Sequence, residues 1–77
     1  MTIQRPNPIH VALPWLYDDG TSVREGTLSG DVHDDNTVDA MTLLLDDGDE
    51  PSLRGRDRRD AEGELRQTAH DMWRRAV

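Results

Sequence analysis

DAEGELRQTAHDMWRRAV, from Asp60 to Val77, is the stretch that decides the fold. Apolar residues recur along it at the spacing that places side chains on one face of a helix; they are Ala61, Leu65, Ala69, Met72, Trp73 and Ala76. We therefore predict an amphipathic helix over 60–77, with Trp73 and Met72 facing the rest of the chain. Because such a face must be covered, the preceding residues are expected to supply an apolar layer.

The start of this helix follows a run of arginines. We predict a linker over 56–60, with Asp57 or Asp60 as the N-cap, because a carboxylate accepts hydrogen bonds from the free amides of a first turn. Gly63 lowers helix stability by about 1 kcal/mol relative to alanine. It indicates either close packing or a frayed first turn.

The N-terminal half has the two-residue period of a strand. Apolar side chains alternate with other residues over 9–17 and predict one buried face; they are Ile9, Val11, Leu13, Trp15 and Tyr17. Pro14 has no amide hydrogen to donate, which favours the edge of a sheet. Asp18, Asp19 and Gly20 predict the turn after this strand. We expect 1–8, with two prolines, to be a loose entry.

A second strand is predicted over 21–28. Val23 and Leu28 would fall on opposite faces of an unbroken strand, and Gly26 between them is the natural place for a bulge. The polar stretch 29–37 is typical of a loop, with Val32 turned inward.

The stretch 38–45 fits either a helix or a strand. An internal similarity favours a strand: LYDDGTSVREG over 16–26 resembles LLDDGDEPSLRG over 44–55, and each copy has the composition of a hairpin. We therefore predict strands at 9–17, 21–28, 39–46 and 51–55. The predicted fold class is α+β: one domain over 1–77, with a small antiparallel sheet of two β-hairpins, about four strands over 9–55, packed against one C-terminal α-helix.

The composition indicates in which cellular compartment the protein is expected. The chain has 77 residues and no cysteine, which excludes disulfides and thiolate chemistry. It has no apolar run of the roughly 20 residues that cross a bilayer, and no signal-peptide pattern at its start. We expect a cytoplasmic protein without membrane contact. Leu16, Met41 and Leu44 are expected on the outer face, which leaves a homodimer open.

Charge is distributed unevenly. The net charge is −7, and residues 18–50 hold eleven acidic residues against the single base Arg24. An acidic surface repels nucleic acid and attracts basic proteins. The residues expected to form this acidic face are Asp18, Asp19, Asp34, Asp35, Asp46, Asp47, Asp49 and Glu50.

Neither a metal site nor a catalytic site is predicted. The acidic turn 46–50 lacks the twelve-residue ligand spacing of an EF-hand loop. Asp31, His33, Asp34 and Asp35 mix imidazole with carboxylates, but a metal site needs further ligands from another element. No nucleophile elbow or glycine-rich phosphate loop is present in the sequence. We therefore expect no cofactor, no metal and no enzymatic activity.

A basic cluster provides the main alternative. Alternate arginines before a helix are able to grip phosphates, and the cluster contains Arg54, Arg56, Arg58 and Arg59. Asp57 and Asp60 interrupt it, which favours internal pairing of these arginines with the acidic turns over nucleic-acid binding.

The leading functional hypothesis is a non-enzymatic protein-interaction module. According to this hypothesis, the protein is a small phage- or plasmid-type regulator or inhibitor, and its acidic surface binds a basic or nucleic-acid-handling protein. The alternatives are a nucleic-acid-binding accessory protein that uses the arginine cluster, and a small subunit of a larger assembly.

Overall fold

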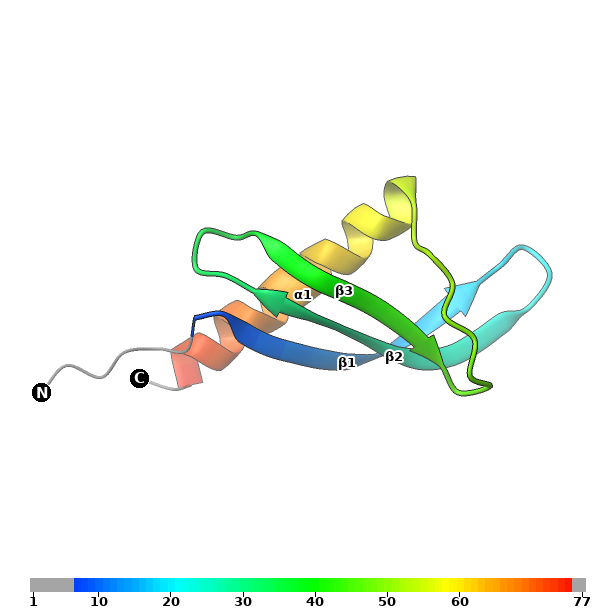
Figure 1. Ribbon diagram of the computed structural model, residues 1–77, viewed down its shortest axis with the longest axis horizontal. Helices are drawn as coiled ribbons and strands as arrows, with labels where there is room; N and C mark the ends of the chain where they lie inside the picture. Colours follow the sequence, from blue (N-terminus) through cyan, green and yellow to red (C-terminus); the bar gives the residue numbers. More distant parts are fainter. Residues whose placement is uncertain (1–6, 76–77) are drawn as a thin grey trace, which may run out of the picture.

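The computed structural model describes residues 7–75 (Figure 1). The elements follow in the order β1 (Ile9–Asp18), β2 (Val23–Val32), β3 (Val38–Leu45) and α1 (Gly55–Arg75). The three strands form one antiparallel sheet in the order β1-β2-β3, and α1 packs across one of its faces. The predicted α+β class is confirmed. The predictions for 1–6 and for the last two residues of the helix lie outside the described residues.

β1 has the predicted two-residue period. Ile9 and Val11 are buried under the helix, and the next three inward positions are partly buried against the same core. β1 pairs with β2 without a register shift, from Ile9 opposite Val32 to Asp18 opposite Val23. Because β1 is an outer strand, Pro14 lies at a sheet edge as predicted.

Two predictions about β2 are wrong. The strand continues to Val32, which is fully buried, so the predicted loop 29–37 begins four residues too early. There is also no bulge at Gly26: the register with β1 is unbroken, and Val23 simply faces solvent with 61% of its surface exposed. A valine on the outer face is tolerated because isolated exposed apolar residues are common.

The bulge lies in β3 instead. Ser29 is opposite Thr42 and Asp31 is opposite Asp39, so the register shifts by one residue between these pairs. Gly30 therefore faces both Ala40 and Met41, and Ala40 has a φ of 54°, in the left-handed region. A residue in this conformation is typical of a bulge that bends the strand.

The fourth strand does not form. The stretch 38–45 is a strand, but the chain after the second Asp-Asp-Gly does not return to the sheet, and 51–54 have no regular secondary structure. Pro51 has no amide hydrogen for a ladder, and Leu53 turns into the core. The second hairpin is formed by β2 and β3 instead, around the turn 33–37, where the His33 amide donates to the Thr37 carbonyl at 2.9 Å.

α1 begins earlier than predicted. It starts at Gly55, which has a φ of 58°, so the predicted linker 56–60 forms the first helical turns. Asp57 lies inside the first turn and Asp60 beyond it, so neither is the N-cap. A side-chain carbon added at Gly63 would have no neighbouring atom within 4 Å, which excludes the close packing considered for this glycine.

The helix buries one face against the sheet. The row at four-residue spacing is buried and consists of Ala61, Leu65, Ala69 and Trp73. Trp73 is 2% exposed and faces the sheet as predicted, whereas Met72 is 37% exposed because it lies beside that row. The far half of α1 is tied to the β2–β3 turn: Arg66 Nε donates to the Asn36 carbonyl at 2.9 Å, and His70 Nε2 lies 2.8 Å from Asn36 Oδ1.

Candidate functional site

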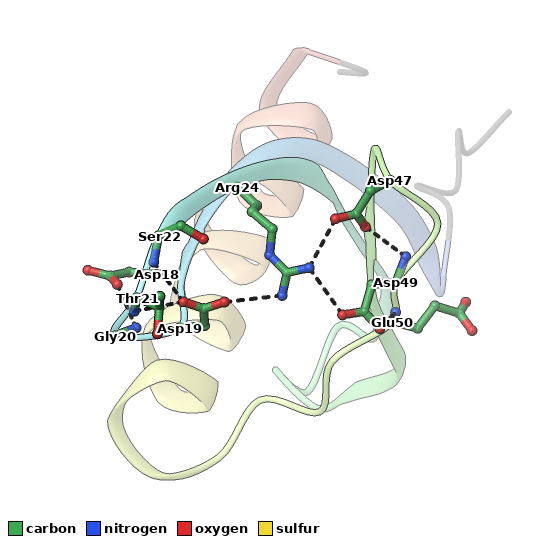
Figure 2. A network of polar contacts seen from close by, with 9 residues as sticks. All are labelled: Asp18, Asp19, Gly20, Thr21, Ser22, Arg24, Asp47, Asp49 and Glu50. Carbon is green, nitrogen blue, oxygen red and sulfur yellow. Dashed lines mark hydrogen bonds and ion pairs between the residues drawn. The ribbon is translucent and has the colours of Figure 1, made fainter.

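Two acidic turns meet at one end of the molecule. The turn 18–22 joins β1 to β2, and the turn 46–50 comes directly after β3. In a three-stranded antiparallel sheet these two points lie at the same end. We call this region the acidic end. It comprises Arg24 together with six carboxylates, Asp18, Asp19, Asp46, Asp47, Asp49 and Glu50. Figure 2 shows Arg24 and all of these carboxylates except Asp46.

Arg24 joins the two turns. Its Nη1 atom lies 3.0 Å from Asp47 Oδ2 and 3.2 Å from Asp49 Oδ2, and its Nη2 atom lies 3.5 Å from Asp19 Oδ2 (Figure 2). The guanidinium carbon also lies 5.8 Å from the centre of the Tyr17 ring, a cation–π contact. The hydrogen bond to Asp47 is the main reason that the pKa of Arg24 is raised. One half-buried arginine thus holds carboxylates from both turns.

Backbone amides fix the same carboxylates. Asp19 Oδ1 accepts hydrogen bonds from the amides of Thr21 and Ser22, both at 2.8 Å. Asp47 Oδ1 accepts one from the Asp49 amide at 2.9 Å. Hydrogen bonds to the charged form favour it. The pKa of Asp19 is lowered, mainly by the Ser22 amide, and the pKa of Asp47 is lowered by the Asp49 amide and then by Arg24.

Asp46 and Glu50 are the two of these six acids whose side chains face solvent without a partner. Among the described residues, neither side chain makes a hydrogen bond or an ion pair, and both residues are exposed. Asp18 uses one oxygen to accept from the Gly20 amide at 2.8 Å. The six carboxylates against one guanidinium leave five negative charges uncompensated, and the exposed Glu25, whose carbonyl accepts from the Asp46 amide, adds a sixth at this end.

The predicted acidic face is divided between the two ends of the sheet. Asp34 and Asp35 lie in the β2–β3 turn, at the end opposite the acidic end. There Asp35 Oδ1 accepts from the Thr37 hydroxyl at 2.6 Å and from the Thr37 amide at 3.0 Å, and these bonds lower the pKa of Asp35. Six of the eight predicted residues therefore come together and two do not.

The arginine cluster does not pair with the acidic turns. Arg58 Nε donates to Glu62 Oε1 at 3.1 Å within the helix, while Arg54, Arg56 and Arg59 make no ion pair with any residue in 7–75. The predicted pairing is therefore wrong for the described residues: the arginine that pairs with the acidic turns is Arg24, and the carboxylates it leaves free are not bound by the cluster. Sequence reasoning missed Arg24 as a site residue, although its being the only base among the acids of 18–50 was a signal.

The candidate metal ligands are separated in pairs. Asp31 Oδ1 lies 2.9 Å from His10 Nδ1 on β1, and His33 Nε2 lies 2.7 Å from Asp39 Oδ2 on β3. Within residues 7–75, no three histidine, aspartate or glutamate side chains gather closely enough to hold a metal ion. Asp31 and His33 are therefore partners of other side chains and not of each other.

The acidic end is suited to electrostatic contact with a positively charged surface, since it gathers six carboxylates around one arginine and several of them are held in place. Over residues 7–75, the structure contains no helix with the length and apolar character needed to cross a membrane. Comparison of the chain with protein-family models, with curated proteins and with solved structures finds no match.

Proposed function

We propose that this protein is a non-enzymatic protein-interaction module whose acidic end binds a basic partner protein. The observation that carries the proposal is the convergence of two acidic turns on Arg24. This arrangement fixes Asp19, Asp47 and Asp49 and leaves Asp46 and Glu50 unpaired toward solvent. A surface that is already ordered loses little conformational freedom when a partner binds.

The partner class follows from the charge. A concentrated patch of carboxylates is complementary to the positively charged surfaces with which proteins grip nucleic-acid phosphates. A protein that handles nucleic acid is therefore the partner we favour, and occupation of its binding surface would make this chain an inhibitor or regulator. Long-range attraction would mainly speed association and would weaken as salt is added.

A matched pair of double variants tests the proposal. Asp46→Asn with Glu50→Gln removes two charges from the acidic end, and Asp34→Asn with Glu64→Gln removes two charges elsewhere. Partner capture from cell lysate, quantified by mass spectrometry at several salt concentrations, should be unchanged for the second variant. The first should lose basic proteins by about tenfold, as expected for two exposed charge contacts. Equal recovery of basic proteins by both variants would contradict the proposal.

A second candidate function is nucleic-acid binding through the start of α1. It is favoured by one observation: Arg54, Arg56 and Arg59 are exposed and without ion pairs among the described residues. Binding of single-stranded and duplex DNA and RNA, titrated with salt, distinguishes the two functions. If the arginines bind phosphates, Arg56→Gln should reduce the slope of log K against log salt by about one. The acidic-end proposal expects no nucleic-acid binding.

A further inference from the structure

A groove runs along the free edge of β3. One wall is formed by strand residues 38–43. The other is formed by the segment 50–53 together with Arg58 and Glu62 of α1, and the groove has a volume of about 530 Å³. β3 is an outer strand of the sheet, so this wall carries backbone groups that are not used by a neighbouring strand.

The hydrogen-bond directions identify a free backbone position. The Asp46 amide donates to the Glu25 carbonyl on β2 at 2.9 Å, whereas the Leu45 amide points the other way and donates to the Asp49 carbonyl at 2.8 Å. Because successive strand residues direct their amides to alternate sides, the N–H and C=O of Leu43 face the groove. Across residues 7–75, no backbone hydrogen bond from outside the sheet reaches Leu43.

The two outer strands differ in how their edges are protected. β1 contains Pro14, which lacks a donor and interrupts any added ladder. β3 contains neither proline nor a basic residue, and the segment VDAMTLLL has Asp39 as its single charge. Its one irregularity is the bulge at Ala40 and Met41, which leaves the stretch beyond it regular. β3 is thus the edge that is better able to accept another strand.

The groove also has a defined chemistry. Its base is apolar, because Leu43 and Leu53 are buried core residues and Met41 is partly buried against them. Its charged lining consists of three carboxylates and one guanidinium, Asp39, Glu50, Glu62 and Arg58. Glu62 is paired with Arg58 and Arg66, and one oxygen of Asp39 lies 2.7 Å from His33 Nε2, so Glu50 is the carboxylate of this lining whose side chain has no partner among the described residues. Asp39 lies near one end of the strand, and Glu50 lies beyond the other end, where the acidic turn closes. An occupant with positive charges and alternating apolar side chains would complement both features.

We propose that an extended segment of the basic partner adds to β3 as a fourth strand in this groove. The wall 38–43 is six residues long, at about 3.3 Å each, and an added segment would pair at Leu43 and bend with β3 past the bulge at Ala40 and Met41. Main-chain hydrogen bonds at Leu43 would hold it, alternate apolar side chains would rest on Leu53, and lysine or arginine would lie toward Asp39 and Glu50. This mode of capture rests on the proposed function. A second copy of the chain is a poorer occupant, because each copy carries a net charge of −7.

A designed peptide provides the test. The probe is a seven-residue peptide with arginine at each end and alternating valine and threonine between them, and its controls carry either glutamate at the ends or N-methyl groups on alternate amides. In an NMR titration of the full-length ¹⁵N-labelled protein, the arginine peptide should shift the Leu43 amide and slow its hydrogen exchange. N-methylation should weaken binding by about tenfold, as expected for the loss of edge hydrogen bonds.

Protein variants separate this inference from the function on which it rests. Asp39→Arg should weaken binding of the arginine peptide about threefold to tenfold, while Glu64→Arg on the helix should change it less. Absence of binding, equal binding of the N-methylated peptide, or shifts confined to 46–50 would overturn the strand addition even if lysate capture still depends on Asp46 and Glu50. Light scattering that shows a dimer with a protected Leu43 amide before peptide is added would also overturn it, in favour of a second copy.

Discussion

At the scale of single residues, Gly26 shows how closely β2 and β3 approach. A side-chain carbon at this position would lie 2.6 Å from the Leu44 carbonyl oxygen and 2.8 Å from Leu45 Cα. Both are backbone atoms, so the neighbouring strand itself would have to move. We predict that Gly26→Ala lowers the free energy of unfolding by about 1–3 kcal/mol, as for other overpacked sites, measured by urea denaturation.

Gly63→Ala is the matched control for that substitution. Gly63 lies inside α1 with no atom within 4 Å of an added side-chain carbon. Here alanine should raise the free energy of unfolding by about 1 kcal/mol, because glycine is the poorer helix former. If both variants were equally stable, this would contradict the close approach of the β3 backbone to Gly26.

Arg24 is the residue whose role the sequence could not supply. Its partners Asp47 and Asp49 lie 23 and 25 positions further along the chain. They are adjacent to it only because β3 returns beside β2 and ends next to the start of β2. The local composition pointed to a lone base among acids, but the pairing depends on strand order. The sequence was therefore enough to nominate the acidic turns and not enough to show how they are joined.

At the scale of elements, Trp73 anchors α1 on the sheet. We predict that Trp73→Ala lowers the free energy of unfolding by about 3–5 kcal/mol, the usual cost of removing a buried aromatic side chain. Met72→Ala is the neighbouring control and should cost under about 0.5 kcal/mol, because Met72 lies at the exposed edge of the helix. Thermal or chemical denaturation of the two variants checks both values, and a stable Trp73→Ala protein would contradict the packing.

The first turns of α1 have an unfavourable charge arrangement. Arginines lie where the helix dipole is positive, and only Asp57 opposes them in the first turn. We predict that Arg56→Glu raises the free energy of unfolding by about 0.3–1 kcal/mol at low salt. Denaturation at low and high salt measures this gain, which should shrink at high salt; Arg75→Glu, at the other end of the helix, should instead be destabilising.

Local patterns predicted the elements whose own residues carry the signal. β1 and the buried row of α1 were correctly predicted because each repeats its apolar positions at the period of its element. The prediction of a fourth strand failed because the two Asp-Asp-Gly segments both place their glycine in the left-handed region but differ in the residues that follow. Gly20 and Gly48 have φ values of 88° and 93°, but Pro51 comes only after the second turn. Whether a chain leaves a sheet after a turn depends on whether its next residues have amide hydrogens to donate to the ladder, which Pro51 lacks. It also depends on whether one of their side chains packs into the core, as Leu53 does.

At the scale of the whole molecule, acid should weaken the fold at both ends of the sheet. The pKa values of Asp19, Asp35 and Asp47 are lowered from 3.8, so each carboxylate stabilises the folded state fully above that value. The contribution is lost as the pH falls through the lower folded pKa values. We predict that stability declines below about pH 3.8. Thermal unfolding from pH 7 to pH 2 should show that the difference in melting temperature between the wild type and Asp47→Asn narrows over the same range. A difference that stays constant with pH would contradict the lowered pKa of Asp47.

The arrangement of the chain ends has a practical consequence. β1 begins and α1 ends at the pole opposite the acidic end (Figure 1). A support attached before β1 or after α1 would therefore be at the end of the molecule opposite the acidic end. The carboxylates of the acidic end would then point away from the support. Copies anchored side by side on a bead, or in tandem through a flexible tether, would form a polyanionic brush. Its avidity for a repetitive basic surface would exceed the single-site affinity by about 10²–10⁴-fold.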